Sequence, residues 1–284
     1  MMSHDHIRML DRSTIQIGSL NDRIYLMDLY PLDISESQVD VFFNKITQEA
    51  DKVGVSKIFA KVPHKLSSHF EERGYREEAA VPGLFADDHG SFMSLYREDW
   101  RKKITNQLEL DAVLHAARKK QNAPLSTKLD TEFTLKTLKE RHAEELAELY
   151  KTVFATYPFP VHEAHFLKEE MRDNVCFSGI FHGSRLIAAA SAEFGKNNWS
   201  AELTDFAVLP EYRKSGLGGV LLHTVEQKAL SCGCKCLYTI ARATSFGVNI
   251  LFSKGGYTYS GTLPNNTNIC GSLETMNIWY KTVG

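Results

Sequence analysis

The chain has 284 residues, against a typical domain length of ~150, so two domains or one long domain are expected. Hydrophobic residues make up 43% of the sequence and charged residues 24%, proportions that exclude a disordered, fibrous or disulfide-scaffold protein. The formal net charge is -2, so the chain has no basic excess for binding nucleic acid or an anionic membrane. The expected partner is a small molecule.

The N-terminal residues and the cysteines indicate the cellular compartment of the protein. No stretch approaches the ~20 apolar residues of a membrane span, and residues 1–6 lack the apolar core of a signal peptide. Of the five cysteines, three lie in Cys232-Gly233-Cys234-Lys235-Cys236, which suits reduced thiols better than disulfides. This spacing without nearby histidines is a weak metal-ligand pattern, so no metal is expected. We expect a cytoplasmic protein.

The first half predicts a short series of alternating elements. In chain order they are a helix over 39–53, a strand over 57–62 and a strand over 92–96. The helix is predicted from apolar residues at helical spacing, and it stops at Gly54, a typical C-terminal residue. Gly74-Tyr75 lies between the two strands, and Pro82 follows eight residues after Gly74.

A polar segment separates the halves. Residues 118–126 are mostly polar and include Pro124, a composition typical of a linker. We place the boundary there, which gives an N-terminal domain over 1–124 and a C-terminal domain over 125–284. Apolar residues at helical spacing predict a connecting helix over 108–117, packed on one of the domains.

The second half repeats the first series. Its expected elements are a helix over 220–229, a strand over 236–240 and a strand over 276–280. Gly256-Tyr257 lies between the strands, and Pro264 again follows eight residues after the glycine. Five landmarks in one order predict an internal duplication.

A glycine loop is present in the second half. The strand over 203–209 leads into Arg213-Lys214-Ser215-Gly216-Leu217-Gly218-Gly219, and the helix follows. Glycines let backbone N–H groups approach an anion, the helix N-terminus adds partial positive charge, and the two cations add formal charge. The loop lacks the G-x-G-x-x-G of dinucleotide folds and the G-K-[ST] of P-loops. It predicts a phosphate site of another kind.

The loop fits R-x-x-G-x-G, and from about Phe133 to Tyr280 the chain resembles the GNAT superfamily of acetyl-CoA-dependent N-acetyltransferases. Two helices and a hairpin over 175–194 precede the strand, as in that family. The resemblance implies an α/β (α+β) GNAT fold with a mixed central sheet, and acetyl-CoA as co-substrate with its pyrophosphate on the loop. It further implies cofactor contacts from Phe206, Ala207, Val208, Asn249 and Phe252.

The first half departs from this pattern, because it has no glycine between Leu29 and Val53. We therefore predict a degenerate GNAT-like N-terminal domain that does not bind CoA. Instead it packs against the substrate side of the C-terminal domain or completes it.

The chemistry requires a base. An aliphatic amine with a pKa near 10.4 must lose its proton at pH 7, at a cost of roughly 4.6 kcal/mol. Glu202 lies fourteen residues before Gly216, a spacing that matches the general-base glutamate in histone acetyltransferases of the superfamily. Strand alternation places Glu202, Thr204, Phe206 and Val208 on one face and Asp205 on the other. We predict Glu202 as the base, with Asp205 as the competitor, and a strand N–H polarising the thioester carbonyl.

The general acid is open. Many family members carry a tyrosine at the position of Phe252 in this sequence. Either Tyr257, Tyr259 or a neighbour replaces it, or the thiolate leaves without an acid, which a thiol pKa near 8.5 permits. Our candidate is Tyr257.

Longer stretches resemble one subfamily, the bacterial and archaeal β-lysine N6-acetyltransferases. They are residues 21–25, 74–83, 157–160 and 201–207. The resemblance implies acetylation of the terminal amine of β-lysine, which yields a compatible solute used in osmoadaptation. Segments expected at the acceptor cleft contain four candidate acceptor-binding residues, which are Tyr157, His162, Asp205 and Arg242.

Two other functions remain open at this point. The acceptor could be lysine, a polyamine or a protein N-terminus. Alternatively, the missing tyrosine at Phe252 could mark a sensor that binds acetyl-CoA without turnover, although an intact Glu202 argues against that. The sequence does not give an oligomeric state, and a homodimer is compatible with it.

Overall fold

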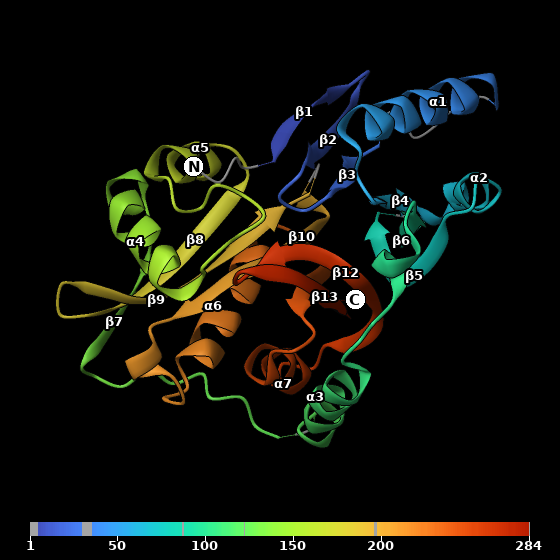
Figure 1. Ribbon diagram of the computed structural model, residues 1–284. Helices are drawn as coiled ribbons and strands as arrows, with labels where there is room; N and C mark the ends of the chain where they lie inside the picture. Colours follow the sequence, from blue (N-terminus) through green and yellow to red (C-terminus); the bar gives the residue numbers. More distant parts are fainter. Residues whose placement is uncertain (1–4, 30–35, 87, 122, 196–197, 284) are drawn as a thin grey trace.

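The computed structural model describes residues 5–29, 36–86, 88–121, 123–195 and 198–283. Two β-sheets form its centre, one from each half of the chain (Figure 1). The first sheet has the strand order β1-β2-β3-β4-β6-β5, and the second has the order β12-β13-β11-β10-β9-β8-β7.

The first half contributes the smaller sheet. Its strands are β1 (His6–Leu10), β2 (Ser13–Gly18), β3 (Arg23–Asp28), β4 (Lys57–Pro63), β5 (Arg76–Phe85) and β6 (Asp88–Tyr96). Its helices are α1 (Glu36–Val53), η1 (His64–Leu66) and α2 (Ser67–Glu71), and η2 (Asp99–Lys102) and α3 (Gln107–Lys119) lead to the second half. Helix α1 forms because Val39, Phe43 and Ile46 share one face, which is buried in the core of this half.

The second half contributes the larger sheet. Its strands are β7 (Phe133–Thr137), β8 (Val175–His182), β9 (Arg185–Phe194), β10 (Ser200–Val208), β11 (Cys236–Arg242), β12 (Thr258–Ile269) and β13 (Ser272–Thr282). Its helices are η3 (Glu140–His142), α4 (Ala143–Val153), α5 (Ala164–Arg172), η5 (Pro210–Tyr212), α6 (Leu217–Ser231) and α7 (Phe246–Lys254). The expected α/β class with a mixed sheet is confirmed.

The predicted duplication is visible in the topology. Strands β8 to β13 follow the same spatial order as β1 to β6, and β7 is an addition at the edge. Each sheet has one parallel pair at the equivalent place, β3 with β4 and β10 with β11, while the neighbouring pairs are antiparallel. The two halves are therefore versions of one fold.

Strands β5 and β12 join the two sheets. The Ala80 N–H donates to Ser260 Oγ over 2.9 Å, and the Trp199 indole donates to the Gly83 carbonyl over 2.8 Å. Gly261 permits this approach, because a Cβ at that position would lie 2.0 Å from the Glu78 carbonyl oxygen. The close contact therefore depends on a missing side chain.

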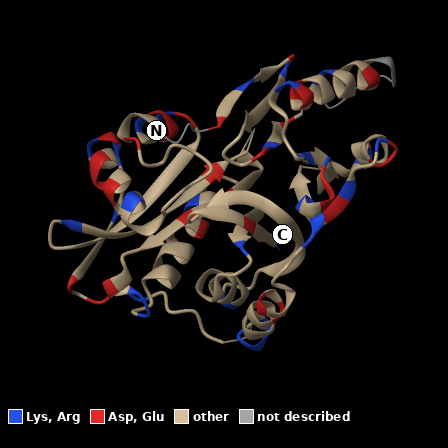
Figure 2. Cartoon of the chain, viewed as in Figure 1, with Lys and Arg blue, Asp and Glu red and all other residues tan. Residues whose placement is uncertain are grey.

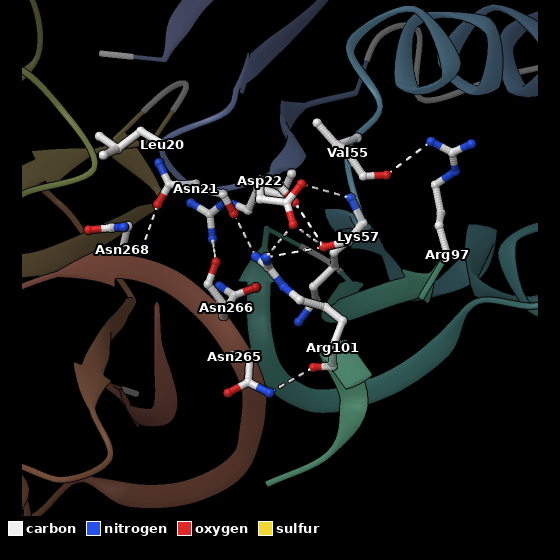
Figure 3. A network of polar contacts seen from close by, with 12 residues as sticks. Leu20, Asn21, Asp22, Val55, Lys57, Arg97, Arg101, Asn265, Asn266 and Asn268 are labelled. Carbon is white, nitrogen blue, oxygen red and sulfur yellow. Dashed lines mark hydrogen bonds and ion pairs between the residues drawn. The ribbon is translucent and has the colours of Figure 1, made fainter. Parts of the chain in front are cut away.

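A polar network extends the contact between the halves (Figure 3). Arg101 donates to the Asn21 carbonyl over 2.6 Å and pairs with Asp22 at 3.2 Å. From the second half, Asn265 donates to the Arg101 carbonyl over 3.0 Å, and the Asn268 N–H donates to Asn21 Oδ1 over 2.7 Å. Hydrogen bonds across the junction thus satisfy several of its buried polar atoms.

The connecting helix packs on the second half. Helix α3 lies beside α7, where Ser253 Oγ donates to the Ala117 carbonyl over 2.7 Å. The predicted helix over 108–117 is confirmed, and its packing partner lies beyond the predicted boundary at Pro124.

Several surface and composition features can be stated for the described residues. No helix among them is long and apolar enough to cross a membrane. They contain no group of three or more His, Cys, Asp and Glu side chains placed to hold a metal ion, and Cys232, Cys234 and Cys236 have free thiols. In the view of Figure 2, acidic and basic residues are interspersed over both halves.

Candidate active site

A cavity of ≈ 600 Å³ is lined by both halves of the chain. The second half contributes Tyr157, Glu193, Glu202 and Asp205 among others. The first half contributes side chains from β3 and β4 that include Arg23, Tyr25, Phe59 and Lys61. The N-terminal half therefore forms part of the wall around the predicted base.

The predicted base lies among three polar neighbours on the sheet. Glu202 is opposite Glu193 on β9 and opposite Tyr238 on β11, so the three side chains share one face. Lys61 Nζ reaches across from the first half and donates to the Tyr238 hydroxyl over 2.9 Å. Carboxylates, phenol and ammonium thus form one cluster at the cavity wall.

Burial shifts the proton affinity of this cluster. Burial raises the pKa of Glu202 to about 8, with a further rise from the Glu193 carboxylate and an opposing effect of Lys61. Burial also raises the pKa of Glu193. A carboxylate with this pKa is a much stronger base than an exposed one, whose pKa is about 4.3.

The structure corrects the predicted face of Asp205. Between Thr204 and Ala207, strand β10 has two residues opposite one residue of β9, and Asp205 has φ 56°. This bulge breaks the alternation, so Asp205 lines the same cavity as Glu202. Asp205 accepts hydrogen bonds from the Tyr157 hydroxyl and, over 2.6 Å, from the Ser191 hydroxyl.

The parallel pair of the second sheet opens beyond Glu202. Strand β10 pairs with β11 over Ser200–Glu202 and Cys236–Tyr238, whereas both strands continue further. On their other sides they remain paired, with Ala207 opposite Ala189 and Ile240 opposite Ile278. Backbone groups of Phe206–Val208 therefore face an opening between two diverging strands, where an extended chain with amide groups could pair.

The glycine loop lies at the end of this opening. Gly216 has φ 84° and caps α6, and Lys214 has φ 68°. In the described residues, the N–H groups from Ser215 to Gly218 donate to no backbone carbonyl, and no side chain caps the helix. Arg213 and Lys214 are exposed beside them. Free amides at a helix N-terminus next to two cations fit a pyrophosphate.

Gly219 has another use in this structure. A Cβ on it would lie 2.2 Å from the Ser126 carbonyl oxygen. The segment after Pro124 therefore runs directly over the start of α6. Gly219 admits this segment, and Leu217 beside it is buried in the core.

Two residues carried over from the family, Asn249 and Phe252, are enclosed by protein. The Asn249 amide donates to the Arg242 and Ser245 carbonyls and accepts from Asn277 and Trp279, so its hydrogen-bonding capacity is used internally. Phe252 is buried against the rings of Phe206 and Tyr257.

Tyr257 does not reach the cavity. It is fully buried, its hydroxyl donates to Glu226 over 3.2 Å, and burial raises its pKa well above the usual value. A phenol of raised pKa is a poor acid for a thiolate. The structure thus does not bring this predicted acid together with Glu202.

The four predicted acceptor residues separate into two pairs. Tyr157 and Asp205 line the cavity and are bonded to each other. His162 and Arg242 are not among the residues that line it, and Arg242 pairs with Glu274 at 3.0 Å.

The sequence interpretation missed other lining residues with chemical potential. Arg23 and Lys61 come from the first half, and Glu193 comes from the strand before β10. The stretch 21–25 had been singled out for its resemblance to the subfamily, so a signal for Arg23 existed without an indication of its role.

Comparison with known proteins places the fold in a family. The model of the acetyltransferase (GNAT) family matches residues 141–253. These residues include β10, the glycine loop and α6.

Relatives match nearly the whole chain. The β-lysine N6-acetyltransferase of Methanococcus maripaludis is 40% identical over 96% of this chain and 97% of its own. The enzyme of the same name from Methanosarcina mazei is 28% identical over 81% of this chain and 92% of its own. N-acetyltransferase YodP of Bacillus subtilis is 33% identical over 73% of this chain and 75% of its own. The chain therefore belongs to the GNAT family of acetyl-CoA-dependent N-acetyltransferases, in the group that contains the β-lysine N6-acetyltransferases.

Proposed function

We propose that this enzyme transfers an acetyl group from acetyl-CoA to the terminal amine of β-lysine and forms N6-acetyl-β-lysine. One observation carries the proposal: an enclosed cavity beside Glu202 contains both carboxylates and buried cations, as a ligand with two amines and one carboxylate requires. The names of the two methanogen relatives support the same acceptor.

Glu202 acts as the general base. A pKa of about 8 reduces its difference from an amine of pKa 10.4 to about 2.4 units, or roughly 3.3 kcal/mol. A carboxylate of ordinary pKa would face a difference of roughly 6 units. Glu202 takes one proton of the terminal ammonium, and the amine nitrogen then bonds to the acetyl carbon while the carbon–sulfur bond breaks. The nitrogen loses a second proton as the amide forms, and this proton goes to the departing CoA thiolate. The free amides of the loop and the opening along Phe206–Val208 hold the donor for this step.

Asp205 serves the second ammonium. Its carboxylate accepts bonds from Tyr157 and Ser191, which oppose the rise in its pKa caused by burial. Hydroxyl donors favour the charged form of the carboxylate. A fixed carboxylate in the cavity is suited to bind the amine that is not acetylated.

The product explains a physiological use. Acetylation removes one positive charge and leaves a zwitterion, which is the charge state of a compatible solute for osmoadaptation. The acetyl donor and the free thiols of Cys232, Cys234 and Cys236 support a cytoplasmic location.

A polyamine is the second candidate acceptor. The described cavity wall contains Asp28, Glu170, Glu193, Glu202 and Asp205, against Arg23 and Lys61 as basic residues. This acidic excess would also suit a ligand with only positive charges.

Steady-state release of CoA from acetyl-CoA distinguishes these functions. The acceptors are β-lysine, α-lysine, spermidine and a short peptide, compared by kcat/KM. We expect the highest value for β-lysine. A preference for spermidine would show that the acceptor is a polyamine and not β-lysine. Binding of acetyl-CoA without release of CoA in any mixture would indicate a sensor.

A further inference from the structure

Arg23 is a buried cation that forms no ion pair with a carboxylate in the part of the chain that the structure describes. Its side chain is 3% exposed, and in the described residues its hydrogen-bond acceptors are all uncharged: the Asn266 carbonyl at 2.5 Å, Thr267 Oγ1 at 3.1 Å and Gln16 Oε1 at 3.4 Å. Its Nε has no hydrogen-bond partner in that part of the chain. Buried charges in proteins are normally paired, and here the carboxylates of Asp5 and Glu202 act on the guanidinium only from beyond ion-pair distance, so a direct partner is missing.

Its neighbours show that the region can supply such partners. Arg101, buried close by in the same network, pairs with Asp22 at 3.2 Å, and the buried Lys57 pairs with Glu78 at 3.4 Å. Among the described residues, no carboxylate lies within 4.0 Å of Arg23. What distinguishes Arg23 from these two cations is that it lines the cavity.

The other cation of the cavity has a different environment. Among the described residues Lys61 likewise has no carboxylate within 4.0 Å, but it donates to the Tyr238 hydroxyl opposite Glu202 and so belongs to the base cluster. Arg23 lies instead beside two adjacent aromatic rings, with its Cζ 5.2 Å from the centroid of the Tyr25 ring and 5.6 Å from that of Phe59. A planar guanidinium fixed in this way suits a carboxylate with two oxygens.

We propose that Arg23 of the N-terminal half binds the carboxylate of the acceptor, and that it makes the enzyme select a diamino acid over a diamine. This inference rests on the proposed function, because it takes β-lysine as the acceptor. In this arrangement the carboxylates hold the amines and Arg23 holds the opposite end of the molecule. The degenerate half thus contributes a specificity-determining residue.

The test compares β-lysine with pentane-1,4-diamine, which is β-lysine without its carboxylate group. We expect the native enzyme to prefer β-lysine by at least about 100-fold in kcat/KM, because the diamine leaves Arg23 unpaired. In Arg23→Gln this ratio should fall by roughly 10- to 100-fold, mainly through the KM for β-lysine. Lys61→Gln is the matched control, and its ratio should stay near the native value because Lys61 belongs to the base cluster.

The outcomes separate the two proposals. If the native enzyme does not acetylate β-lysine, the proposed function fails whatever the variants do. If it does, and Arg23→Gln retains the native ratio or Lys61→Gln alone loses it, the assignment to Arg23 is overturned. Circular dichroism checks folding, and if Arg23→Gln is unfolded, Arg23→Lys carries the test. An ammonium cannot match both carboxylate oxygens, so we expect the ratio to fall about 10-fold, and an unchanged ratio would overturn the assignment.

Discussion

The two halves of this chain have one topology and different surroundings at the equivalent position. In the first sheet, β3 pairs with β4 over Arg23–Leu26, and aromatic side chains such as Tyr25 and Phe59 pack there with ring centroids 4.8 Å apart. In the second sheet, β10 and β11 separate after Glu202, and a glycine loop follows.

The difference shows how a duplicated fold can be divided between two tasks. Both halves retain a bulge in the strand before the parallel partner, at Met27 in β3 and after Thr204 in β10. The second half follows its bulged strand with a glycine loop and free amides, whereas the sequence of the first half has no glycine between Leu29 and Val53. The first half places its equivalent strand against the cavity, where it supplies side chains instead of backbone donors.

The largest effect should come from removing the base in the second half. Glu202→Gln keeps the size of the side chain and loses its proton affinity, so kcat should fall by roughly 10²- to 10⁴-fold. Binding of acetyl-CoA, measured by calorimetry, should be unchanged with one molecule per chain. Near-normal turnover would show that Glu202 is not the base, and two molecules per chain would show that the first half binds the donor.

The Glu193 carboxylate beside the base should influence the pH dependence of kcat/KM. Glu202 must be deprotonated to act, so kcat/KM should rise with pH through a midpoint near 8. Glu193 contributes to that raised pKa, so Glu193→Gln should move the midpoint to lower pH, by about one unit. The measurement is a pH profile of CoA release for both proteins. A midpoint that stays in place or moves upward would contradict the coupling.

Two glycines can distinguish the role of the loop in binding acetyl-CoA from the general effect of backbone strain on folding. Gly216 and Gly54 both have positive φ, of 84° and 75°, but Gly216 begins α6 whereas Gly54 follows the end of α1. Alanine at either site should destabilise folding by about 1 kcal/mol. Only Gly216→Ala should also raise the KM for acetyl-CoA, by roughly 5- to 10-fold, because it disturbs the amides that face the donor. Equal KM values in the two variants would mean that the loop does not hold the pyrophosphate.

The smallest effect on catalysis should come from the contact between the sheets. Gly261→Ala places a Cβ 2.0 Å from a backbone oxygen of β5, so the strands must separate, at a cost of about 2 kcal/mol. Thermal melting measures the loss. Gly247→Ala is the control, since no atom lies within 4 Å of its added Cβ. If both variants melted together, the close approach would not contribute to stability.

Sequence reasoning reached the features that local patterns specify. Helix α1, the strand before the loop and the duplication follow from periodicity and from glycine positions, and Glu202 lies on the cavity wall. Alternation failed at Asp205, because a bulge depends on pairing with another strand and leaves no local mark.

Other parts of the site depend on chain segments that are distant in sequence. Arg23 meets the cavity only because β3 packs beside the second half, and no pattern around it states this. Asn249 and Tyr257 show the opposite limit. Resemblance indicates the position of Asn249, and Tyr257 is our candidate to replace the tyrosine missing at Phe252. Whether either side chain is offered to a ligand or used internally depends on its neighbours, here Asn277, Trp279 and Glu226.

The shared wall of the cavity has a thermodynamic consequence. A ligand that contacts both halves at once binds only while they are packed together, so its binding free energy adds to the free energy that holds them together. Separation of the sheets and loss of the acceptor are then one equilibrium, and saturation with acceptor makes the two halves unfold more cooperatively. We expect acetyl-CoA to contact the second half, and therefore to stabilise that half without strengthening the junction.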